Sequence, residues 1–502
     1  MKIQTLTILI VFMLLVIIPS DASFAKQAPK DMTEQMKQSI VYLQTSFYGY
    51  EQYRPWRHRK LTENWACAVA VAPYQVITPA WNVANVSFIK ALRYGQNEFI
   101  GAKIKIIDYQ SNLCLIELDA NSMSEPLVPL KFSKEYQKGA EVQFYWLSSG
   151  NHLYNGRGYL DRATVEKTNI SYERRLRYVV ANASQQTGSG QLYCIGSKPL
   201  GIACWSNKNK EAGIIPGEAV NAFLAEAADG QYKGFGAVGF KCSELLDPAL
   251  RSYLKMPESL KTGVYVEDVY TLGTASELIK KGDVILAIDG KSLNSYGRFL
   301  HPKYDRLFYH HLITSKKVGE KVVLEIFRDG KKTEFEADVK NFKASEMLVP
   351  YHEFDRQPEY VITGGFIFQK LTREYLAEWG DNWQGKVSPH LYHYFRDMAF
   401  EPTNERTDIV ILSYVLPAPI NLGYKDLRQL VIKEFNGMKI RSIADVKNAM
   451  TLNPESKYHV IEFEMDNPTV VIPRENLSVA DMLIARNYGI QKLVNLNQTS
   501  PD

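Results

Sequence analysis

The sequence has few of the residues that build disulfide frameworks or zinc centres. Its five cysteines are an odd number without CxxC spacing, and its nine histidines form no HExxH motif. This pattern argues against a disulfide scaffold and a zinc hydrolase, and we predict no metal and no other cofactor. Cys67 and Cys114 lie inside apolar runs, where a buried free thiol is the usual state.

Neither sign of charge dominates the chain. Lys and Arg number 59 against 55 Asp and Glu, so the net charge is only +4. A balance this even predicts no nucleic-acid surface. With 45% hydrophobic and 23% charged residues the chain has a globular composition, which excludes wholesale disorder, collagen and coiled coil. Its 502 residues, at roughly 150 per domain, predict three or four domains.

Long apolar runs are absent after the N-terminus. Residues 6–18 are almost wholly apolar, follow Lys2 and precede the small-residue stretch ASFA. This layout predicts a secretory signal peptide over residues 1–25, cleaved before Lys26. An uncleaved anchor is the alternative, although about 13 apolar residues are fewer than the ~20 that span a bilayer. We therefore expect an exported protein, periplasmic or secreted.

The chain then divides into a β-rich part and two mixed parts. Residues 38–227 alternate short β-branched or aromatic runs with turn residues, which predicts a β-barrel or sandwich closed by a helix over 218–227. A linker over 228–234 follows.

Residues 234–342 read as an α+β module. Its expected elements are a strand over 263–269, a short helix over 274–280, a strand over 284–290 and a hairpin that turns at Asp329-Gly330. A related pattern recurs over 346–490, with an aromatic helical insertion around 375–400 and a helix over 442–450. The matching segments ILAIDG (285–290) and IKEFNG (432–437) indicate an internal duplication.

Four segments carry a resemblance to a known family. They are IIPGEAVNAFL (214–224), KGDVILAIDG (281–290), LVPYHEFDRQPEYVITGGFIF (348–368) and YLAEWGDNW (375–383). They resemble the HtrA/Deg family, and the last two resemble its plant-type Deg branch. The resemblance implies a mainly β protein, with a trypsin-like double β-barrel over 38–227. Two α+β PDZ-like domains would follow, at 234–342 and 346–490, the second with an insertion.

The same resemblance locates three catalytic positions. The family's histidine segment reads ITPAW here, which puts Trp81 at the position of the base. The aspartate segment reads SNLCL, which puts Asn112 at the position of the acid. The nucleophile segment reads TGSGQL and keeps Ser189, with Thr187 and Gln191 in place of glycines. Thr187 replaces the residue whose amide would donate to the oxyanion.

These replacements predict an inactive barrel. An indole has no lone pair that accepts the serine proton, and a triad without its histidine loses turnover on the order of 10⁶-fold. Only His58 and His152 precede residue 228, and both are expected in loops. The alternative is an active serine endopeptidase with an unusual base. Ser189 itself can also be a small residue that the turn requires.

The segment GFGAVG (234–239) matches the dinucleotide pattern GxGxxG. No strand precedes it and no helix opens on its last glycine, which argues against a Rossmann site. Ala237, Val238, Gly239 and Phe240 instead fit the X-Φ-G-Φ loop with which PDZ domains bind a peptide's terminal carboxylate, beside a strand edge that accepts the peptide. A strand start with a turn glycine is the alternative.

Two further clusters are open to two interpretations each. His390 and His393 would share one helix face, either as half of a metal site or on an aromatic docking helix, and the absence of nearby ligands favours the helix. An aromatic cluster precedes the barrel strands. Aromatic residues are favoured at interfaces, and the resemblance to the HtrA/Deg family implies a trimer-based homo-oligomer, so we expect the cluster at a subunit contact, with core packing as the alternative. Its members are Tyr42, Phe47, Tyr48, Tyr50, Tyr53 and Trp56.

The sequence thus predicts an exported HtrA/Deg-like pseudoprotease that binds unfolded proteins or peptide C-termini through the first PDZ domain, as a chaperone or scaffold. An active Deg-type endopeptidase in protein quality control and a regulatory subunit of an active paralogue are the alternatives.

Overall fold

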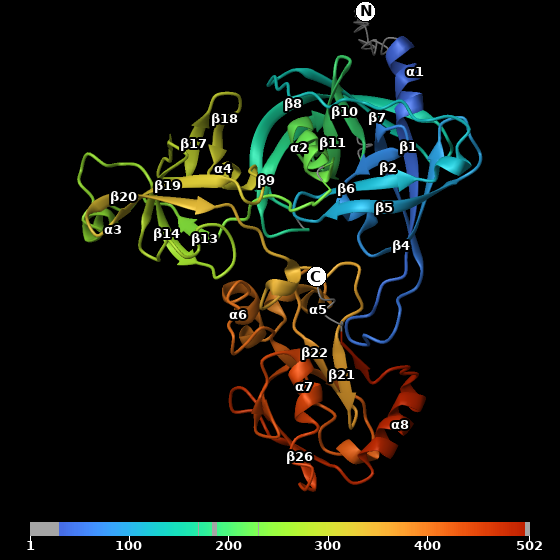
Figure 1. Ribbon diagram of the computed structural model, residues 1–502, viewed down its shortest axis with the longest axis vertical. Helices are drawn as coiled ribbons and strands as arrows, with labels where there is room; N and C mark the ends of the chain where they lie inside the picture. Colours follow the sequence, from blue (N-terminus) through green and yellow to red (C-terminus); the bar gives the residue numbers. More distant parts are fainter. Residues whose placement is uncertain (1–29, 169, 183–187, 229, 497–502) are drawn as a thin grey trace, which may run out of the picture.

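The structure is a computed structural model that describes residues 30–168, 170–182, 188–228 and 230–496. The predicted signal peptide lies outside these residues. Two barrels stand side by side at one end of the molecule, the first α+β module lies beside the second barrel, and the second module lies below (Figure 1). None of the described helices is long and apolar enough to cross a bilayer.

The first barrel is a closed sheet in the order β1-β2-β3-β6-β5-β4. Helix α1 (Lys30–Ser39) precedes it. The side chains inside it are small or aliphatic, and the centres of β1, β2 and β6 are buried on both faces, because one face of each strand lines this core and the other packs into the core shared with the second barrel. Its strands are β1 (Ile40–Phe47), β2 (Thr62–Ala72), β3 (Gln75–Thr78), β4 (Val86–Arg93), β5 (Ile100–Asp108) and β6 (Leu113–Leu118).

The second barrel closes in the order β10-β11-β12-β9-β8-β7. Helix α2 (Gly217–Ala228) then packs Val220 and Phe223 into the core that the two barrels share. The predicted double barrel and its closing helix are therefore confirmed. The strands are β7 (Glu141–Leu147), β8 (Leu153–Lys167), β9 (Arg174–Asn182), β10 (Leu192–Ile195), β11 (Lys198–Ser206) and β12 (Glu211–Pro216).

The first α+β module is built on a sheet in the order β13-β14-β15-β19-β20, so β13 is an edge strand. The predicted hairpin is confirmed, since Asp329 and Gly330 join β19 to β20 with left-handed φ values of 50° and 80°. The elements are β13 (Phe240–Ser243), α3 (Pro248–Tyr253), β14 (Val264–Val269), β15 (Val284–Ile288), β16 (Lys291–Ser292), β17 (Arg298–His301), β18 (Asp305–Phe308), α4 (His310–Thr314), β19 (Lys321–Arg328) and β20 (Lys331–Asp338).

The helix predicted over residues 274–280 is wrong. This segment is a bridge followed by turns. Thr274 gives its amide to the Ala237 carbonyl (2.9 Å) and accepts the Gly239 amide (3.1 Å), and Ala275 has a left-handed φ of 66°. The left-handed backbone of Ala275 departs from helical geometry, and the Thr274 carbonyl, which would accept the first bond of the helix, is already taken by Gly239.

The second α+β module has an eight-stranded sheet along the path β27-β26-β24-β23-β22-β21-β28, with β25 paired to β24. The predicted helix over 442–450 is observed as α7, with Ser442 as its N-cap. The elements are β21 (Tyr360–Thr363), β22 (Phe366–Lys370), α5 (Arg373–Ala377), η4 (Trp383–Gly385), α6 (Pro389–Asp397), β23 (Val410–Val415), β24 (Leu430–Phe435), β25 (Met438–Lys439), α7 (Ile443–Ala449), β26 (Tyr458–Phe463), β27 (Val470–Pro473), α8 (Leu477–Tyr488) and β28 (Val494–Asn495).

The aromatic cluster before the barrel strands contacts the second module of the same chain. The Tyr53 ring lies edge-on to Tyr375 and Trp379, each at 5.4 Å between centroids. The Trp56 indole donates to the Tyr488 carbonyl (3.3 Å). Tyr42, in contrast, is part of the barrel core. Interdomain and core packing therefore use three of the six residues that we expected at a subunit contact, whereas Tyr48 remains exposed.

An arm at the start of the second module, residues 351–356, clasps the first barrel. Asp355 accepts the Asn85 amide (2.8 Å) and donates its own amide to the Asn85 side chain (2.6 Å). Its carboxylate also accepts the Tyr109 hydroxyl, and the Tyr109 and Phe354 rings lie 4.3 Å apart. The clasp holds residues 352–354 beside the barrel end where β3 terminates.

Asp355→Ala should loosen this clasp. The change removes two hydrogen bonds to a carboxylate, so it costs about 1–3 kcal/mol of local stability. We expect trypsin to cleave after the neighbouring Arg356 at least about fivefold faster than in the wild type, as measured by mass spectrometry. Asp381→Ala, at an exposed turn, is the control. Equal cleavage rates would show that the arm is held by other contacts.

Candidate functional site

Trp81 is the residue that the family resemblance assigns to the position of the base. It lies on η1 (Ala80–Val83), the turn after β3, and its side chain is 49% exposed. Its ring faces the arm of the second module, with centroids 6.5 Å from His352 and 6.4 Å from Phe354. An indole in this place offers a packing surface and no proton acceptor.

Asn112 lies between β5 and β6, is buried and has a left-handed φ of 60°. Its side-chain oxygen accepts the Trp81 amide (3.0 Å), and its carbonyl accepts the Ala80 amide (3.2 Å). The two residues that the resemblance assigns to the acid and base positions are therefore joined by a hydrogen bond between the Asn112 side chain and the Trp81 backbone. Asn112 holds η1 in place instead of orienting an imidazole.

Ser189 is in the turn before β10, and its hydroxyl oxygen is buried without a hydrogen-bond partner among the described residues. Its carbonyl accepts the Cys67 amide (3.3 Å). Gly190 has a φ of 85°, and a Cβ on it would lie 1.9 Å from the Cys67 carbonyl oxygen, so only glycine fits. Contacts with the Cys67 backbone therefore constrain this turn. No described group accepts a hydrogen bond from the Ser189 hydroxyl.

The structure brings two of the three predicted residues into contact. Trp81 and Asn112 share a hydrogen bond, and Ser189 connects to the same region only through the backbone of Cys67, whose carbonyl accepts the Thr78 hydroxyl (2.8 Å). Gln191 is buried, with its side-chain oxygen unpaired among the described residues. Thr187 lies outside the described residues.

The two histidines of the barrel part contact residues close to them in the chain. The Nδ1 atom of His58 lies 2.9 Å from the Tyr48 carbonyl, and the two rings stack at 4.0 Å. His152 lies in the turn between β7 and β8, near Tyr154. Neither ring hydrogen-bonds Ser189.

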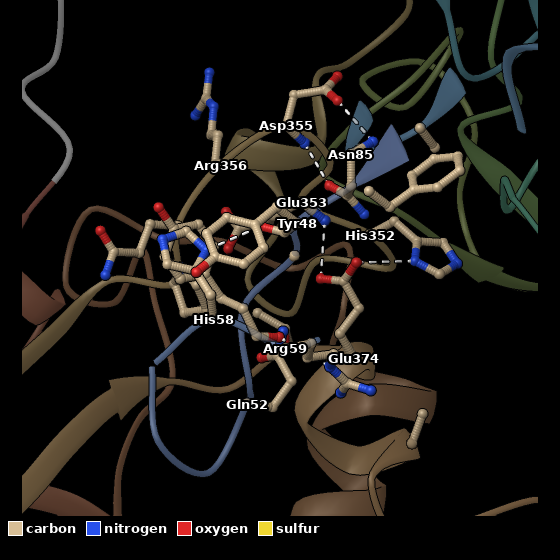
Figure 2. A pocket seen from close by; sticks show the side chains of 18 of the residues that line it. Tyr48, Gln52, His58, Arg59, Asn85, His352, Glu353, Asp355, Arg356 and Glu374 are labelled. Carbon is tan, nitrogen blue, oxygen red and sulfur yellow. Dashed lines mark hydrogen bonds and ion pairs between the residues drawn. The ribbon is translucent and has the colours of Figure 1, made fainter. Parts of the chain in front are cut away.

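Sequence reasoning missed His352. This imidazole comes from the second module and approaches Trp81, and its Nδ1 atom pairs with the Glu374 carboxylate at 3.1 Å (Figure 2). The Arg373 guanidinium lies 3.3 Å from its other nitrogen. Only the folded clasp places this distant residue near the barrel, so no local signal could have found it.

Two cavities lie where the arm meets the barrel. One of about 380 Å³ is lined by Trp81, His352, Phe354 and Glu374. The other, of about 860 Å³, lies between residues 47–60 and the second module and carries several charged side chains, as Figure 2 shows. Ser189 lines neither of them.

The thiol nearest to the serine turn is not a substitute nucleophile. Cys67 is buried, and burial raises the pKa of its thiol to about 12. The thiolate that acts as a nucleophile is therefore scarce at neutral pH.

The predicted carboxylate loop is buried against the second barrel. Ala237, Val238, Gly239 and Phe240 all have less than a tenth of their surface exposed. The Ala237 amide donates to the Lys340 carbonyl (2.9 Å) and the Gly239 amide to the Thr274 carbonyl. The Val238 amide hydrogen-bonds the carboxylate of Glu173, which precedes β9. A side-chain carboxylate of the chain itself thus lies at this loop.

Glu173 is a buried acid with an unusual proton affinity. Burial raises its pKa to about 7, against the opposing effects of the Arg175 charge and of the Val238 amide. Near neutral pH the carboxyl is therefore close to half protonated. The negative charge that it brings to the loop depends on pH.

The paired histidines of α6 have separate acidic partners. His390 contacts Glu464 (2.9 Å), and His393 contacts Asp397 (2.9 Å). Within the part of the chain that the structure describes, no group of three or more potential ligands is arranged to hold a metal ion.

Comparisons with known proteins agree with this architecture. The model of the PDZ domain family matches residues 239–339, and a second PDZ model matches residues 349–496. Protease Do-like 4, mitochondrial, of Arabidopsis thaliana is 26% identical over 440 residues, which cover 86% of this chain and 80% of the relative. Protease Do-like 2, chloroplastic, of the same plant is 26% identical over 446 residues, with 87% and 71% covered.

The chain belongs to the HtrA/Deg family. Among solved structures, the HtrA-type protease AlgW with decapeptide covers 62% of this chain and 99% of its own, with 18% identity and a TM-score of 0.47. The two α+β modules are PDZ domains, and the barrels are the serine-protease part of an HtrA/Deg protein.

The raised pKa of Glu173 predicts a pH-dependent stability. The folded chain holds this proton to about pH 7, whereas an ordinary glutamate releases it near 4.5, so the stabilisation is present at low pH and is lost as pH rises from about 4.5 to about 7. Relative to Glu173→Gln, the free energy of unfolding of the wild type should fall by up to about 3 kcal/mol over this window.

Urea denaturation at pH 4.5 and 7.5 measures the difference. Glu98→Gln, which removes an exposed carboxylate of the first barrel, is the control and should follow the wild type. A Glu173→Gln difference that is the same at both pH values would contradict the assignment.

Proposed function

We propose that this HtrA/Deg protein is an exported pseudoprotease that holds unfolded chains or peptide C-termini and does not cut them. The observation that carries the proposal is the Ser189 hydroxyl, which is buried and has no hydrogen-bond partner among the described residues. Deprotonation of a serine requires a base within hydrogen-bond reach. Trp81 cannot accept the proton, and the carboxamide of Asn112 already accepts the backbone of η1.

Export is part of this proposal and rests on the sequence of residues 1–25. A trimer-based homo-oligomer is a further part. It is supported by an exposed set of large apolar side chains on the first barrel, since such patches favour association. The set consists of Tyr48, Trp65, Phe88 and Phe99.

Casein digestion tests the loss of proteolysis. Without a base, turnover should fall on the order of 10⁶-fold below that of an active triad, so the wild type should release no more peptide than Ser189→Ala. The two proteins form the matched pair, because the change removes one oxygen from a turn that keeps both glycines. Casein cleavage that Ser189→Ala abolishes would establish the alternative, an active Deg-type endopeptidase.

Peptide binding is proposed for the first PDZ domain, where the edge strand β13 follows the loop 237–240. The free edge of β13 can accept an added strand, and the Val238 amide already binds a carboxylate, that of Glu173. A peptide's terminal carboxylate would replace Glu173 at this amide. Glu173 is then an internal competitor for the ligand.

Glu173→Ala should therefore strengthen binding of C-terminal peptides by about tenfold, the ratio expected when a competing charge-assisted hydrogen bond is removed. Gly239→Glu should abolish it, because a Cβ on Gly239 would lie 2.5 Å from the Thr274 carbonyl oxygen and because the new charge would repel the ligand. A library of fluorescent peptides with free and amidated C-termini measures both effects.

Glu98→Ala is the control for the lost charge, and circular dichroism checks the fold of Gly239→Glu. Equal binding of free and amidated peptides would contradict a carboxylate site. Peptides that bind neither the wild type nor Glu173→Ala would favour the regulatory-subunit alternative.

A further inference from the structure

Two arginines of β9 are buried without a direct ion pair to an acidic side chain of the described residues. Arg175 is 7% exposed and Arg177 is 1% exposed. Neither guanidinium forms an ion pair with a carboxylate of the described residues, and the Nε atom of Arg177 has no hydrogen-bond partner among them. Residues two apart on a strand point to the same side, so both positive charges enter one region of the interior.

Backbone carbonyls accept hydrogen bonds from only some of the N–H groups of the two guanidinium groups. Arg175 donates to the carbonyls of Gln110 (2.9 Å), Thr314 and Gly236 (3.4 Å). Arg177 donates to its neighbour Leu176 (2.8 Å) and to Ser111 (3.4 Å). Each guanidinium has five N–H groups, so several donors remain, and carbonyl dipoles do not neutralise a full charge.

The acidic groups nearby are engaged elsewhere. Asp108 acts on Arg175 at longer range, but its oxygens accept the Gln110 amide (2.8 Å) and the Tyr232 hydroxyl (2.6 Å). The Cys204 thiol contacts Arg177, yet burial raises its pKa and keeps it neutral. Glu173 also acts on Arg175, so two acidic groups lie within longer range of that guanidinium. Arg177 has no carboxylate in contact among the described residues, and because buried charges in proteins are normally paired, it lacks a counter-anion.

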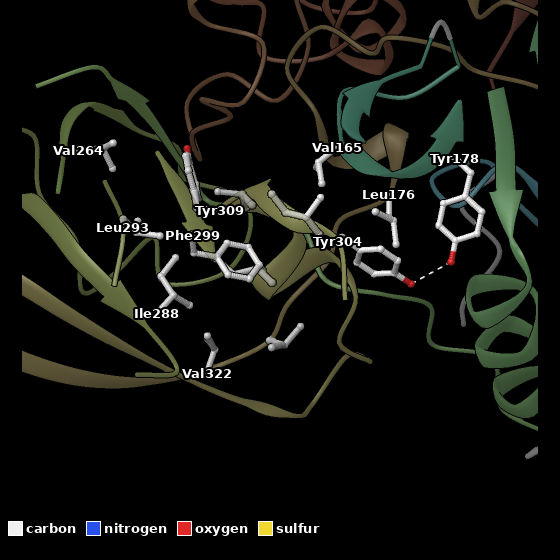
Figure 3. Packing of buried hydrophobic residues seen from close by; sticks show 14 of the residues in the cluster. Val165, Leu176, Tyr178, Val264, Ile288, Leu293, Phe299, Tyr304, Tyr309 and Val322 are labelled. Carbon is white, nitrogen blue, oxygen red and sulfur yellow. Dashed lines mark hydrogen bonds between the residues drawn. The ribbon is translucent and has the colours of Figure 1, made fainter. Parts of the chain in front are cut away.

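Both arginines line one cavity of about 280 Å³ between β9, α2 and the first PDZ domain. Its apolar wall includes Leu176, Phe235 and Ala222. Figure 3 shows the neighbouring core, where the hydroxyls of Tyr304 and Tyr178 lie 2.9 Å apart. An empty apolar cavity of about 150 Å³ holds a benzene ring, so this one has room for roughly eleven heavy atoms.

The other titratable groups of the wall do not supply the missing charge. Glu218 is neutralised by Lys303 (3.0 Å) and accepts the Tyr304 hydroxyl. His301 and His311 have pKa values lowered by burial, that of His311 to about 4, so both rings are neutral at pH 7. The cavity therefore has two guanidinium groups at one end, of which Arg177 lacks a counter-anion among the described residues, and an apolar wall at the other.

We propose that this cavity binds a small organic monocarboxylate. Its carboxylate would pair with the free donors of Arg177 and Arg175, and its apolar tail would lie against Leu176, Phe235 and Ala222. A guanidinium and a carboxylate match in geometry as well as in charge. The site is separate from the positions of Trp81, Asn112 and Ser189 and does not depend on the proposed function.

Calorimetric titration of the full chain with sodium octanoate, octan-1-ol and sodium acetate tests the proposal. Octanoate has ten heavy atoms and carries both features. We expect it to bind at one site and at least about tenfold more tightly than octanol, which lacks the charge, and acetate, which lacks the tail. Octanol binding as tight as octanoate, acetate binding as tight as octanoate, or no saturable octanoate binding would each overturn the proposal.

Three variants locate the site. Ala222→Leu fills the cavity from α2 and should weaken octanoate binding at least about tenfold, whereas Ala225→Leu, on the exposed face of the same helix, should leave it within twofold. Arg177→Met should remove the preference for octanoate over octanol. Unchanged octanoate binding in Ala222→Leu would overturn the assignment even if Arg177→Met fails to fold.

Discussion

Arg175 joins three parts of the molecule through one buried side chain. It extends from β9 of the second barrel, and its guanidinium donates to Gln110 of the first barrel and to Gly236 and Thr314 of the first PDZ domain. Hydrogen bonds to a charged donor are stronger than neutral ones, and burial strengthens them further. The relative placement of the two barrels and the first PDZ domain therefore rests on a buried charge on which Asp108 and Glu173 act without a direct ion pair.

The residues that the family resemblance assigns to the catalytic positions make structural contacts. Asn112 fixes η1 through two hydrogen bonds, and Trp81 presents its ring to the arm of the second PDZ domain. A working triad needs a polar, accurately oriented site whose strain costs stability. The loss of proteolysis that we propose would remove that requirement and free Trp81 for interdomain packing. Gly190 fits its place because the Cys67 carbonyl leaves no room for a Cβ.

Local patterns predicted most of the fold. The succession of short β-branched or aromatic runs and turn residues indicated the barrels, and Asp329-Gly330 indicated the hairpin. Both signals depend on neighbouring residues alone. The failure at residues 274–280 has a long-range cause, since Thr274 pairs with the loop 237–239. The positions of Trp81, Asn112 and Ser189 followed from the resemblance to the family. The contacts of His352, Glu173 and Arg177 could not be predicted from the sequence, because each joins segments far apart in the chain.

The two proposed sites share Arg175. Glu173 acts on Arg175 and also binds the Val238 amide of the carboxylate loop, while the cavity ligand would place its own carboxylate beside Arg175. A second anion beside that guanidinium competes with Glu173 for the same positive charge. Glu173 would then lose part of its counter-charge, which favours its protonation and weakens its hold on Val238. By reciprocity, a peptide that displaces Glu173 from the loop would raise the affinity of the cavity for its ligand by the same factor.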